Sequence, residues 1–520
     1  MSELLWWRGP RYVLACVVAA LAALLGCGVA LRYWALGLTL SHYDARGHIV
    51  VARRIFDSLT PGWQQIGAVW LPLPHLLNAL PVQVDALYRT GASGTALSIA
   101  SFAVATAAIA WIVASMTGSW LAACAGALVF ALNPNVLYLQ ATPMTEPLLI
   151  ALTVGSIALL MAYCEAVAEH GSSDAATPSH AGSQFDRVGA WPSAPSSTLV
   201  GWTFALACLT RYEAWPVTIG SLAAAVWVLW RRGVALPQSV RAIVAVATYP
   251  TAAIIGFSIF SKVVVGAWFA NGFFVPENPA QGRPLEAVSL IVWGLRELSG
   301  NGVLAAAVVG ALVLVGSALF VRRRSACILP LVLLGTAAVP WSAFIDGHPY
   351  RIRYMVPLIA VQGICAGVAA GSWAKARLPL VALLVMIAAF ELRPMNLSAP
   401  MVSEAQWDRP NIQARDAVTS CLQRDYAGES VMASMGSLGH YMQDLSRAGF
   451  SIRDFLHEGN GDIWLNALHS PRPFAGWMLI EEKAEGGDML AKIARERPEF
   501  LDGYSRVCDA AGVALYRRVR

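Results

Sequence analysis

The sequence predicts a polytopic α-helical membrane protein with about eleven spans and a small water-exposed α/β domain at its C-terminal end. The first supporting observation is composition: the chain has 520 residues, of which 57% are hydrophobic and only 13% are charged. A soluble domain carries about 25% charged residues, so these few charges cannot cover a soluble globule of this size. The other two observations are a series of long apolar runs and a polar C-terminal tail.

The apolar runs are the predicted transmembrane helices, because about 20 apolar residues in a helix cross the hydrocarbon core. The eleven runs lie near residues 12–36, 94–115, 119–139, 147–164, 198–212, 214–230, 241–267, 302–321, 326–345, 353–373 and 377–392. The fifth and sixth runs are short, and one broken pair around Arg211 is an alternative to two spans. Gly, Ala and Ser recur within the runs, as suits close helix packing in lipid.

The positions of Lys and Arg predict the orientation, because cytoplasmic loops are enriched in both residues. With the N-terminus inside, the inside ends of the runs receive every basic cluster of the short loops: Arg8 and Arg11, Arg231, Arg232 and Arg241, Arg322 to Arg324, and Lys375 with Arg377. Eleven spans from an inside start leave the C-terminal tail outside. We therefore expect a multi-pass protein of the bacterial inner (cytoplasmic) membrane whose tail is extracytoplasmic.

Three long loops interrupt the predicted bundle: two on the outer face, at about 37–93 and 268–301, and one on the inner face, at 165–197. The first outer loop covers about 37–93, and its segment SHYDARGHIVVARRIFDSL at 41–59 aligns Ile49, Ala52, Phe56 and Leu59 on one helical face. This pattern predicts a helix that lies in the membrane interface, and 72–88 is a second such segment, interrupted at Pro81. The loop at 165–197 is rich in Ser, Ala, Pro and Gly, and it is expected to be a disordered cytoplasmic linker.

The predicted domains are residues 1–393, in the membrane, and 394–520, outside it. The tail mixes charged residues with short apolar strings at 430–434 and 476–480 and a helical stretch at 488–495, which favours a small α/β domain. Cys421 and Cys508 are its only cysteines, and a disulfide between them can form in an oxidising compartment. No cysteine or histidine spacing typical of a metal site occurs, and we expect neither a metal nor a cofactor.

The acidic candidates for catalysis lie at the predicted outer face. Asp44 follows Tyr43 directly after the first run, and His48 follows one helical turn later. A carboxylate at the membrane surface can remove a proton from a hydroxyl group, although Asp44 also suits the N-cap of a helix. Glu146 lies between the third and fourth runs on the same side, where a solvated first-turn acid is the alternative.

The basic candidates lie at the ends of later runs. Arg211 and Glu213 separate the fifth and sixth runs, where ionisable residues are costly and are either functional or paired with each other. Arg351 and Arg353 begin the tenth run on the outer face, against the positive-inside trend. Arginine binds phosphate with good geometry, and contact with lipid headgroups is the alternative. The further candidates are His348 and Tyr354, beside these arginines, together with Tyr43 and Glu213.

Several segments carry a resemblance to a known family. They are SHYDARGHIVVARRI, PLPHLL, the residues 127–163 that contain ALNPNVLYLQATPMTEPLLI, ALACLTRYEAWPV at 205–217, and RIRYMVPLIA at 351–360. In this order they resemble the membrane-embedded GT-C glycosyltransferases, in the branch that contains protein O-mannosyltransferases and bacterial aminoarabinose transferases. The resemblance covers about residues 10–370 and is most specific at 127–163, whereas the tail resembles no family.

The resemblance implies an inverting glycosyltransferase that moves a sugar from a polyprenyl-phosphate donor to a hydroxyl group of a glycan, lipid or protein acceptor. Asp44 matches the catalytic base, and Glu146 matches the acid that follows the third span. Arg211 and Arg353, and next Arg351, match residues that hold the lipid phosphate. Many relatives have Asp-Glu at the catalytic position, where this chain has Asp44-Ala45. The role of the second acid is therefore unfilled or falls to His48 or Glu146.

Two other classes of protein remain alternatives. A lipid or polysaccharide transporter or flippase would use the charged residues as a pathway, but the charges gather at one face and the two halves of the sequence show no repeat. A scaffold whose tail binds a partner is the third reading. The sequence contains no nucleotide-binding loop and no basic patch for nucleic acid, so the expected partners are the lipid-linked donor, its acceptor and membrane lipids.

Overall fold

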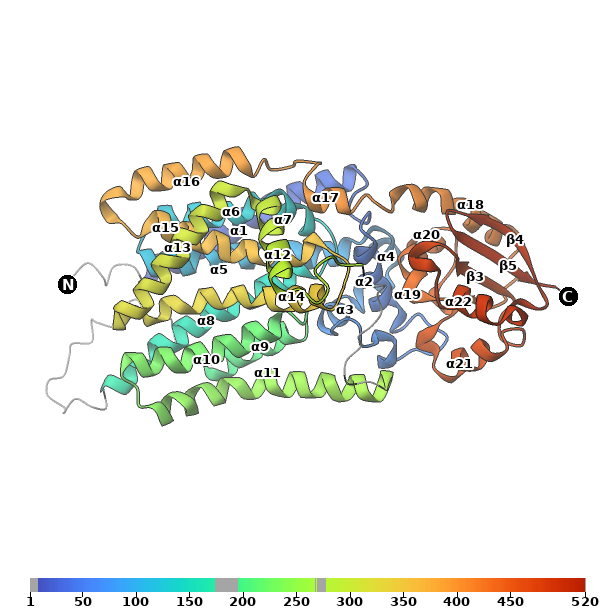
Figure 1. Cartoon of the computed structure of the whole chain (residues 1–520), viewed down its shortest axis with the longest axis horizontal. Helices are drawn as coiled ribbons and strands as arrows, with labels where there is room; N and C mark the ends of the chain where they lie inside the picture. The colour runs from blue at the N-terminus through green and yellow to red at the C-terminus, as the bar shows by residue number, and fades with distance from the viewer. Residues whose placement is uncertain (1–7, 174–194, 267, 269–276, 520) are drawn as a thin grey trace.

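The fold is a helix bundle with a small mixed sheet at one end, as a computed structural model describes it for residues 8–173, 195–266, 268 and 277–519. The bundle helices run along the long axis of the molecule, and the chain starts at the end opposite the sheet (Figure 1). Residues 174–194 of the predicted linker lie outside the described residues. The preceding helix α8 continues to Ser173, which is eight residues beyond the expected start of that linker.

Seven helical segments are long and apolar enough to span a membrane. The described part of the chain is therefore that of a multi-pass integral membrane protein. These segments comprise α1 (Arg8–Ala35), α5 (Ala92–Thr117), α8 (Glu146–Ser173), α11 (Leu236–Val265), α13 (Asn301–Phe320), the pair η4 (Arg322–Ala337) and α14 (Ala338–Ile345), and the pair η5 (Ile352–Met355) and α15 (Leu358–Gly371).

The other four predicted spans are helical but shorter or less apolar, so the number eleven stays a prediction. They are α6 (Trp120–Ala131) with α7 (Pro134–Leu139), α9 (Ser197–Cys208), α10 (Ala214–Arg232) and α16 (Arg377–Glu391). The third predicted span is broken because the side chain of Asn133 accepts the N–H groups of Asn135 and Val136 and starts a new helix at Pro134. Helix α9 ends at Cys208 and α10 begins at Ala214, and the chain turns at Arg211 between them. This local geometry is that of the alternative prediction, a helix pair broken around Arg211.

Close backbone contacts hold the bundle together, as the recurring small residues predict. A Cβ atom on Gly126 of α6 would lie 2.7 Å from the carbonyl oxygen of Gly363 on α15, and one on Gly363 would lie 2.8 Å from that of Gly126. At the end of the bundle near the N-terminus, Arg322 donates to the carbonyl of Arg231, which brings two of the predicted inside clusters together.

The first outer loop folds into five short helices instead of the two predicted interfacial segments at 41–59 and 72–88. They are α2 (Tyr43–Arg54), η1 (Trp63–Ile66), α3 (Leu73–Asn78), η2 (Pro81–Gln83) and α4 (Asp85–Thr90). The break at Pro81 was predicted, but the helix proposed for 41–59 ends at Arg54, and Phe56 and Leu59 are exposed beyond it. Moreover, Arg46 and Arg53 are buried. The prediction of a surface helix was therefore wrong, because α2 is covered by other parts of the protein.

The C-terminal region contains the small mixed sheet that the sequence predicts. Its strand order is β2-β1-β3-β5-β4, with parallel pairs around β1 and antiparallel pairs around β5. The strands are β1 (Val431–Ala433), β2 (Phe455–Leu456), β3 (Trp477–Glu481), β4 (Tyr504–Ala510) and β5 (Val513–Arg518). The helices of this region are α17 (Pro400–Glu404), α18 (Arg409–Asp425), α19 (Met435–Leu438), α20 (Met442–Arg447), α21 (Asp462–His469) and α22 (Met489–Glu496). Cys421 and Cys508 form the predicted disulfide.

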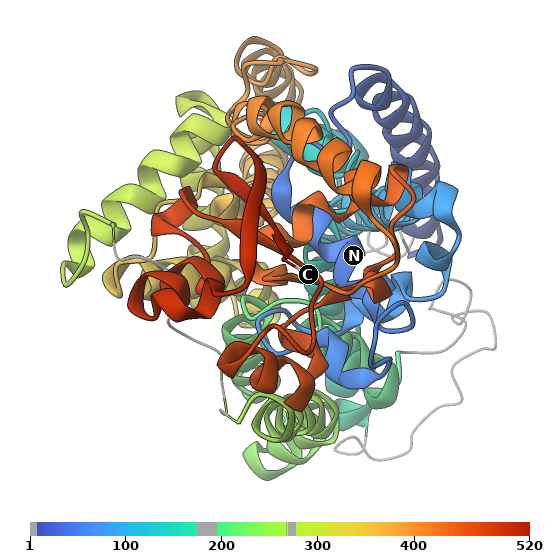
Figure 2. The same ribbon diagram turned by 90° about the vertical axis from the view of Figure 1, so that its right-hand side faces the viewer.

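The C-terminal domain packs directly on the first outer loop, as the orange and red elements over the blue ones show (Figure 2). One hydrophobic core contains Ile49 and Val50 of α2 together with Val431 and Phe455 of the sheet. Asp57 pairs with Arg53 at 2.9 Å and with Arg453 at 3.2 Å, and Arg46 pairs with Asp444 of α20 at 2.5 Å. The C-terminal domain therefore holds α2 in place from the side opposite the bundle.

Candidate active site

The catalytic candidate Asp44 stands in the first turn of α2, which the side chain of His42 caps. His42 Nδ1 accepts the N–H of Asp44 at 3.1 Å, so the N-cap belongs to His42 and not to Asp44. Because Nδ1 accepts, the ring proton lies on Nε2, which faces Glu404 Oε1 of α17 at 3.5 Å. His42 and Glu404 are both buried. The helix start and the Asp44 backbone are thus fixed by a buried His–Glu pair.

The carboxylate of Asp44 forms an ion pair with Arg353 of η5. Both side chains are buried, and the two residues are more than 300 positions apart in the chain. Burial raises the pKa of Asp44, but the positive charge of Arg353 more than offsets this effect and lowers the pKa to about 2. Asp44 is therefore ionised at neutral pH, and its proton affinity depends on where the Arg353 guanidinium lies.

His48 lies one turn along α2 and contacts a second histidine. Its Nδ1 is 3.2 Å from Nε2 of His75 on α3, and the Trp70 ring covers it at a centroid distance of 4.2 Å. Trp70 can approach α2 because residue 47 is glycine: a Cβ there would lie 2.8 Å from the indole. Burial lowers the pKa of His48 well below its usual value and that of His75 to about 3. Both rings are therefore neutral.

A second ion-pair cluster forms around Arg211, in the turn between α9 and α10. Arg211 is 3.1 Å from Glu146 and 2.8 Å from Glu213, and it donates to the Thr145 hydroxyl at 3.0 Å. Glu146 begins α8 and is fully buried. Arg211 therefore links the turn before α10 to the start of α8 through the two acids. The ion pair between Arg211 and Glu213, which the sequence analysis gave as an alternative to a functional role, is present.

The two ion-pair clusters belong to one site. Arg353 interacts electrostatically with Glu146 of the other cluster and with Arg211. His48 interacts with both arginines. Asp44 in turn interacts with His48. The structure thus brings together residues that the sequence separates by up to about 310 positions. The prediction that the acids and arginines converge holds for Asp44, His48, Glu146, Arg211 and Arg353.

The remaining candidates lie around Arg353. Its guanidinium lies 5.8 Å from the ring centroid of Tyr43 and 5.3 Å from that of Tyr354. His348 packs against Tyr354 at 5.6 Å. Arg351 interacts electrostatically with Tyr43 and has an intermediate exposure. All four residues therefore border the Asp44–Arg353 pair without joining it.

Sequence analysis missed three residues that the C-terminal region brings to this site. Besides Glu404, they are His440 and Asp408, whose side chains lie 3.6 Å apart. The His440 ring lies 6.2 Å from that of Tyr43. Burial lowers the pKa of His440 to about 4, and the nearby negative charge of Asp44 partly opposes this effect. No local pattern marks these positions, because Glu404 and His440 reach the site through His42 and Tyr43, more than 350 positions earlier in the chain, and Asp408 reaches it through His440.

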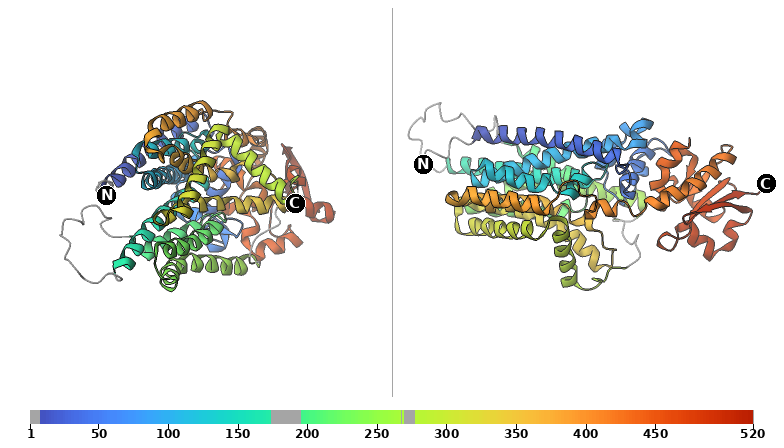
Figure 3. Two further views of the ribbon diagram at one scale, coloured as in Figure 1. Left: turned by 60° about the vertical axis from the view of Figure 1, so that its left-hand side comes forward. Right: turned by 90° about the horizontal axis from the view of Figure 1, so that it is seen from above.

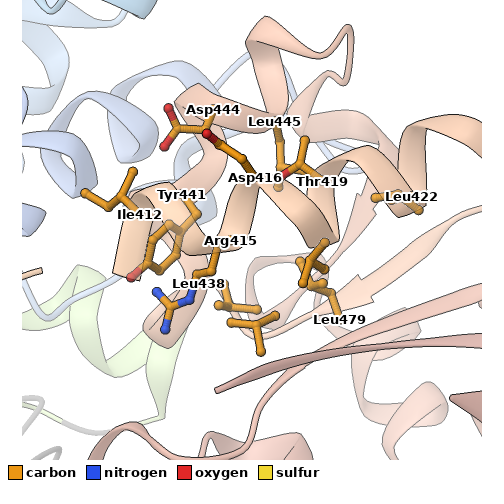
Figure 4. A pocket seen from close by; sticks show the side chains of 12 residues that line it. Ile412, Arg415, Asp416, Thr419, Leu422, Leu438, Tyr441, Asp444, Leu445 and Leu479 are labelled. Atoms are coloured by element: carbon orange, nitrogen blue, oxygen red, sulfur yellow. The ribbon is translucent and has the colours of Figure 1, made fainter. Parts of the chain in front are cut away.

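Pockets elsewhere are distinct from this site. A pocket of the C-terminal domain is enclosed by α18, α20 and the sheet, and none of the predicted site residues lines it (Figure 4). Its one buried cation is Arg415, which lies over the Tyr441 ring at 3.9 Å and pairs with Glu481. Within the described residues, no three His, Cys, Asp or Glu side chains are grouped closely enough to hold a metal ion.

The chemistry of the site follows from its charges. Asp44 offers a carboxylate that can accept a proton, whereas Arg353 and Arg211 offer positive charge that can stabilise a phosphate. The blue first outer loop, which carries Asp44, lies at the end of the bundle that faces the C-terminal domain (Figure 3, right). Arg353 pairs with Asp44 there, and Arg211 interacts electrostatically with Arg353. An arrangement at such a helix end can act on a molecule whose polar part is in water and whose tail is in lipid.

Comparison with known proteins identifies solved structures that share this fold. No family model matches the chain, and no curated protein matches its sequence significantly. Two crystal structures of ArnT from Cupriavidus metallidurans match it: the apo state with a TM-score of 0.57 and the state bound to undecaprenyl phosphate with 0.55. Each alignment covers 95% of this chain and 97% of ArnT at 13% identity. The predicted resemblance to the aminoarabinose transferase branch is thus confirmed in the fold, and this chain is a multi-pass membrane protein with the architecture of ArnT.

Proposed function

We propose that this protein is an inverting glycosyltransferase that moves a sugar from a polyprenyl-phosphate donor to a hydroxyl group at the outer face of the membrane. The observation that carries the proposal is the buried contact of Asp44 with Arg353, beside Arg211, in a chain with the architecture of ArnT. A carboxylate can deprotonate an acceptor hydroxyl group, and two arginines can hold a phosphate leaving group. That ArnT was crystallised with undecaprenyl phosphate supports the choice of donor class.

The reaction exchanges one bond of the anomeric carbon for another and transfers one proton. The acceptor oxygen attacks the anomeric carbon, and the bond from this carbon to the phosphate oxygen breaks as the polyprenyl phosphate leaves with the bonding electrons. The hydroxyl proton passes to a carboxylate oxygen of Asp44. Arg353 stabilises the negative charge that grows on the phosphate, and Arg211 holds the phosphate equally before and during bond breaking. Attack from the face opposite the phosphate inverts the configuration of the sugar.

Donor binding also changes the pKa of Asp44, because Asp44 pairs with Arg353 before the donor binds. When the donor phosphate binds, it competes with Asp44 for the guanidinium of Arg353. Loss of this contact removes the main influence that lowers the pKa of Asp44, while burial continues to raise it. Asp44 thereby becomes a stronger base once the donor is bound. His48 and Glu146 are proposed to support Asp44, and Arg351 to guide the phosphate.

The location is part of the proposal. We assign the site and the C-terminal domain to the extracytoplasmic side, because the basic clusters at the opposite end of the bundle match the positive-inside rule. The Cys421–Cys508 disulfide supports an oxidising compartment for the domain. In a bacterium this is the outer face of the inner membrane, where a polyprenyl-linked sugar meets a glycan, lipid or protein acceptor.

The test is the release of free polyprenyl phosphate by the purified protein. Polyprenyl-phosphate sugars are supplied together with candidate acceptors, and the lipid phosphate is separated and quantified. We expect release that depends on the acceptor, and a loss of at least about 100-fold with Asp44→Asn, the usual size of general-base catalysis. The matched control is the exposed Asp502→Asn. Full activity of a folded Asp44→Asn protein, or transbilayer movement of an intact donor without cleavage, would reject the proposal, and the second outcome would favour a flippase.

A further inference from the structure

A polar cavity lies at the outer end of the bundle, apart from the residues of the candidate active site. It holds about 300 Å³. Its walls are Arg296 and Glu297 at the end of α12 (Pro284–Ser299), Asn301 at the start of α13, and Glu391 and Arg393 where α16 ends. Figure 1 shows α17 following α16 at the end of the bundle nearest the C-terminal domain. The cavity is therefore on the same side of the bundle as Asp44.

The charges in this cavity are not balanced by one another. The carboxylate of Glu391 is engaged, since it accepts the N–H groups of Gly302 and Val303 at 2.7 and 2.8 Å and caps α13. Arg296, Glu297 and Arg393 are exposed, and over the described ranges no ion pair or side-chain hydrogen bond joins them to another residue. Two guanidinium groups and one carboxylate are thus available to a ligand.

The depth of the cavity points to lipid headgroups. It lies where α13 begins and α16 ends, which is the level at which apolar helices meet water. Helix α12 runs across the bundle direction (Figures 1 and 3) and exposes Leu285, Val288, Val292 and Trp293. An amphipathic helix with such a surface lies in the membrane interface. Arginines on the outer face also run against the positive-inside trend, so they need a local partner.

The backbone that presents Arg393 is strained. Arg393 and Met395 have φ values of 43° and 67°, in the left-handed region that costs a non-glycine residue about 1 kcal/mol or more. The loop is nevertheless held closely. Asn396 donates its N–H to the Arg393 carbonyl at 3.2 Å, and its side chain accepts the N–H of Ser398 at 3.0 Å. Strain that the surroundings maintain in this way is typical of ligand sites.

We propose that this cavity binds the zwitterionic headgroup of a membrane phospholipid, of the phosphoethanolamine class. Arg296 and Arg393 bind the phosphate diester through charge-assisted hydrogen bonds. Glu297 binds the primary ammonium group, and the acyl chains extend along the exposed apolar face of α12. The single free carboxylate selects against a purely anionic headgroup. This site is separate from the donor phosphate site around Arg353, and the inference does not depend on glycosyl transfer.

The test measures lipid binding to the delipidated full-length protein in detergent by native mass spectrometry. The probes are dioctanoyl phosphatidylethanolamine, dioctanoyl phosphatidylglycerol, dioctanoylglycerol and inorganic phosphate. We expect each chain to bind one phosphatidylethanolamine molecule tightly. Its affinity should exceed that of each of the other three probes. The double variant Arg296→Gln/Arg393→Gln should weaken it by about tenfold or more, the loss expected for charge-assisted contacts. Arg283→Gln, which removes an exposed ion pair with Glu286 at the start of α12, should leave phosphatidylethanolamine binding unchanged.

A second variant distinguishes recognition of the ammonium group from recognition of the phosphate. Glu297→Gln should weaken the binding of phosphatidylethanolamine. The binding of phosphatidylglycerol should stay unchanged or become tighter. Thermal unfolding of each variant verifies folding, and these exposed side chains should not affect it. Three results would overturn the proposal: equal binding of phosphatidylglycerol, equal binding of inorganic phosphate as a free ion, or tight phosphatidylethanolamine binding that persists in the double arginine variant.

Discussion

At the residue scale, the central feature is that Arg353 and Arg211, the two arginines proposed to hold the donor phosphate, already pair with carboxylates. Arg353 contacts Asp44, and Arg211 contacts Glu146 and Glu213. Removing either arginine leaves a buried charge without its partner, which destabilises a protein by about 3–5 kcal/mol. Conservative substitutions therefore separate binding from folding better than alanine does.

The substitution Arg211→Lys should raise the donor KM by about tenfold while kcat changes little. Lysine keeps the charge that Glu146 and Glu213 need, but it loses the planar fork that binds a phosphate through two hydrogen bonds. A contact made equally in the ground state and the transition state affects KM alone. Arg283→Lys at the protein surface is the control. A drop in kcat at unchanged KM would instead place Arg211 in the chemical step.

The pH dependence of kcat/KM should report the Asp44–Arg353 pair. Because the free protein holds the pKa of Asp44 at about 2, its protonation should not limit kcat/KM anywhere between pH 4.5 and neutral. In Arg353→Gln the lowering charge is gone and burial raises the pKa of Asp44 above its usual value. The acid limb should then appear above about pH 4. An unchanged pH profile in this variant would contradict the pairing.

At the element scale, glycine sets how closely the bundle helices approach. A Cβ atom on Gly310 of α13 would overlap the carbonyl oxygen of Cys365 on α15, whereas one on Gly316 of the same helix meets nothing within 4 Å. Gly310→Ala should therefore destabilise the protein by about 1–3 kcal/mol through overpacking. Gly316→Ala should be neutral or stabilise it, since alanine favours helices. Thermal unfolding in detergent compares them, and equal stability of the two variants would refute this packing.

The elements also indicate what sequence can predict. Among the described residues, each of the eleven apolar runs is helical over most of its length. The strings at 430–434 and 476–480 contain most of β1 and β3. Both were predictable because hydrophobicity and its period are local signals. The length and burial of α2 were not predictable, since its burial depends on partners such as Asp444, 398 positions away from Arg46. In the same way, Asp44, Glu146 and Arg353 were found from local chemistry, whereas Glu404, Asp408 and His440 depend on the docked C-terminal domain.

At the scale of the whole molecule, buried histidines concentrate where the first outer loop meets the C-terminal domain. Burial lowers the pKa of His75 and His457 to about 3 and that of His440 to about 4. In the unfolded chain each would have a pKa near 6.5. The unfolded state therefore binds more protons in the interval between these values, so acid favours unfolding.

Stability should accordingly be complete above about pH 6.5 and fall as the pH decreases toward 4. Each histidine contributes roughly 1.4 kcal/mol per pH unit within this window. Thermal unfolding between pH 7 and 4.5 measures the slope. His457→Asn can retain the hydrogen bond from Gly459 and should reduce the slope, whereas His469→Asn, at an exposed position, should not. A slope that both substitutions leave unchanged would assign the acid sensitivity to other groups.

The packing of α2 on the C-terminal domain also fixes the order in which this protein can be made. The ribosome delivers Arg46 398 residues before its partner Asp444, which at about 5–20 residues per second is a delay of roughly 20–80 seconds. On the proposed topology the loop is by then outside the membrane, and most of the hydrophobic core that it shares with the C-terminal domain has not yet been made. The apolar face of α2, with Ile49 and Val50, is then open to the lipid surface or to a chaperone. A truncated chain that stops before the sheet would carry Asp44 on a helix that has never been assembled into its site.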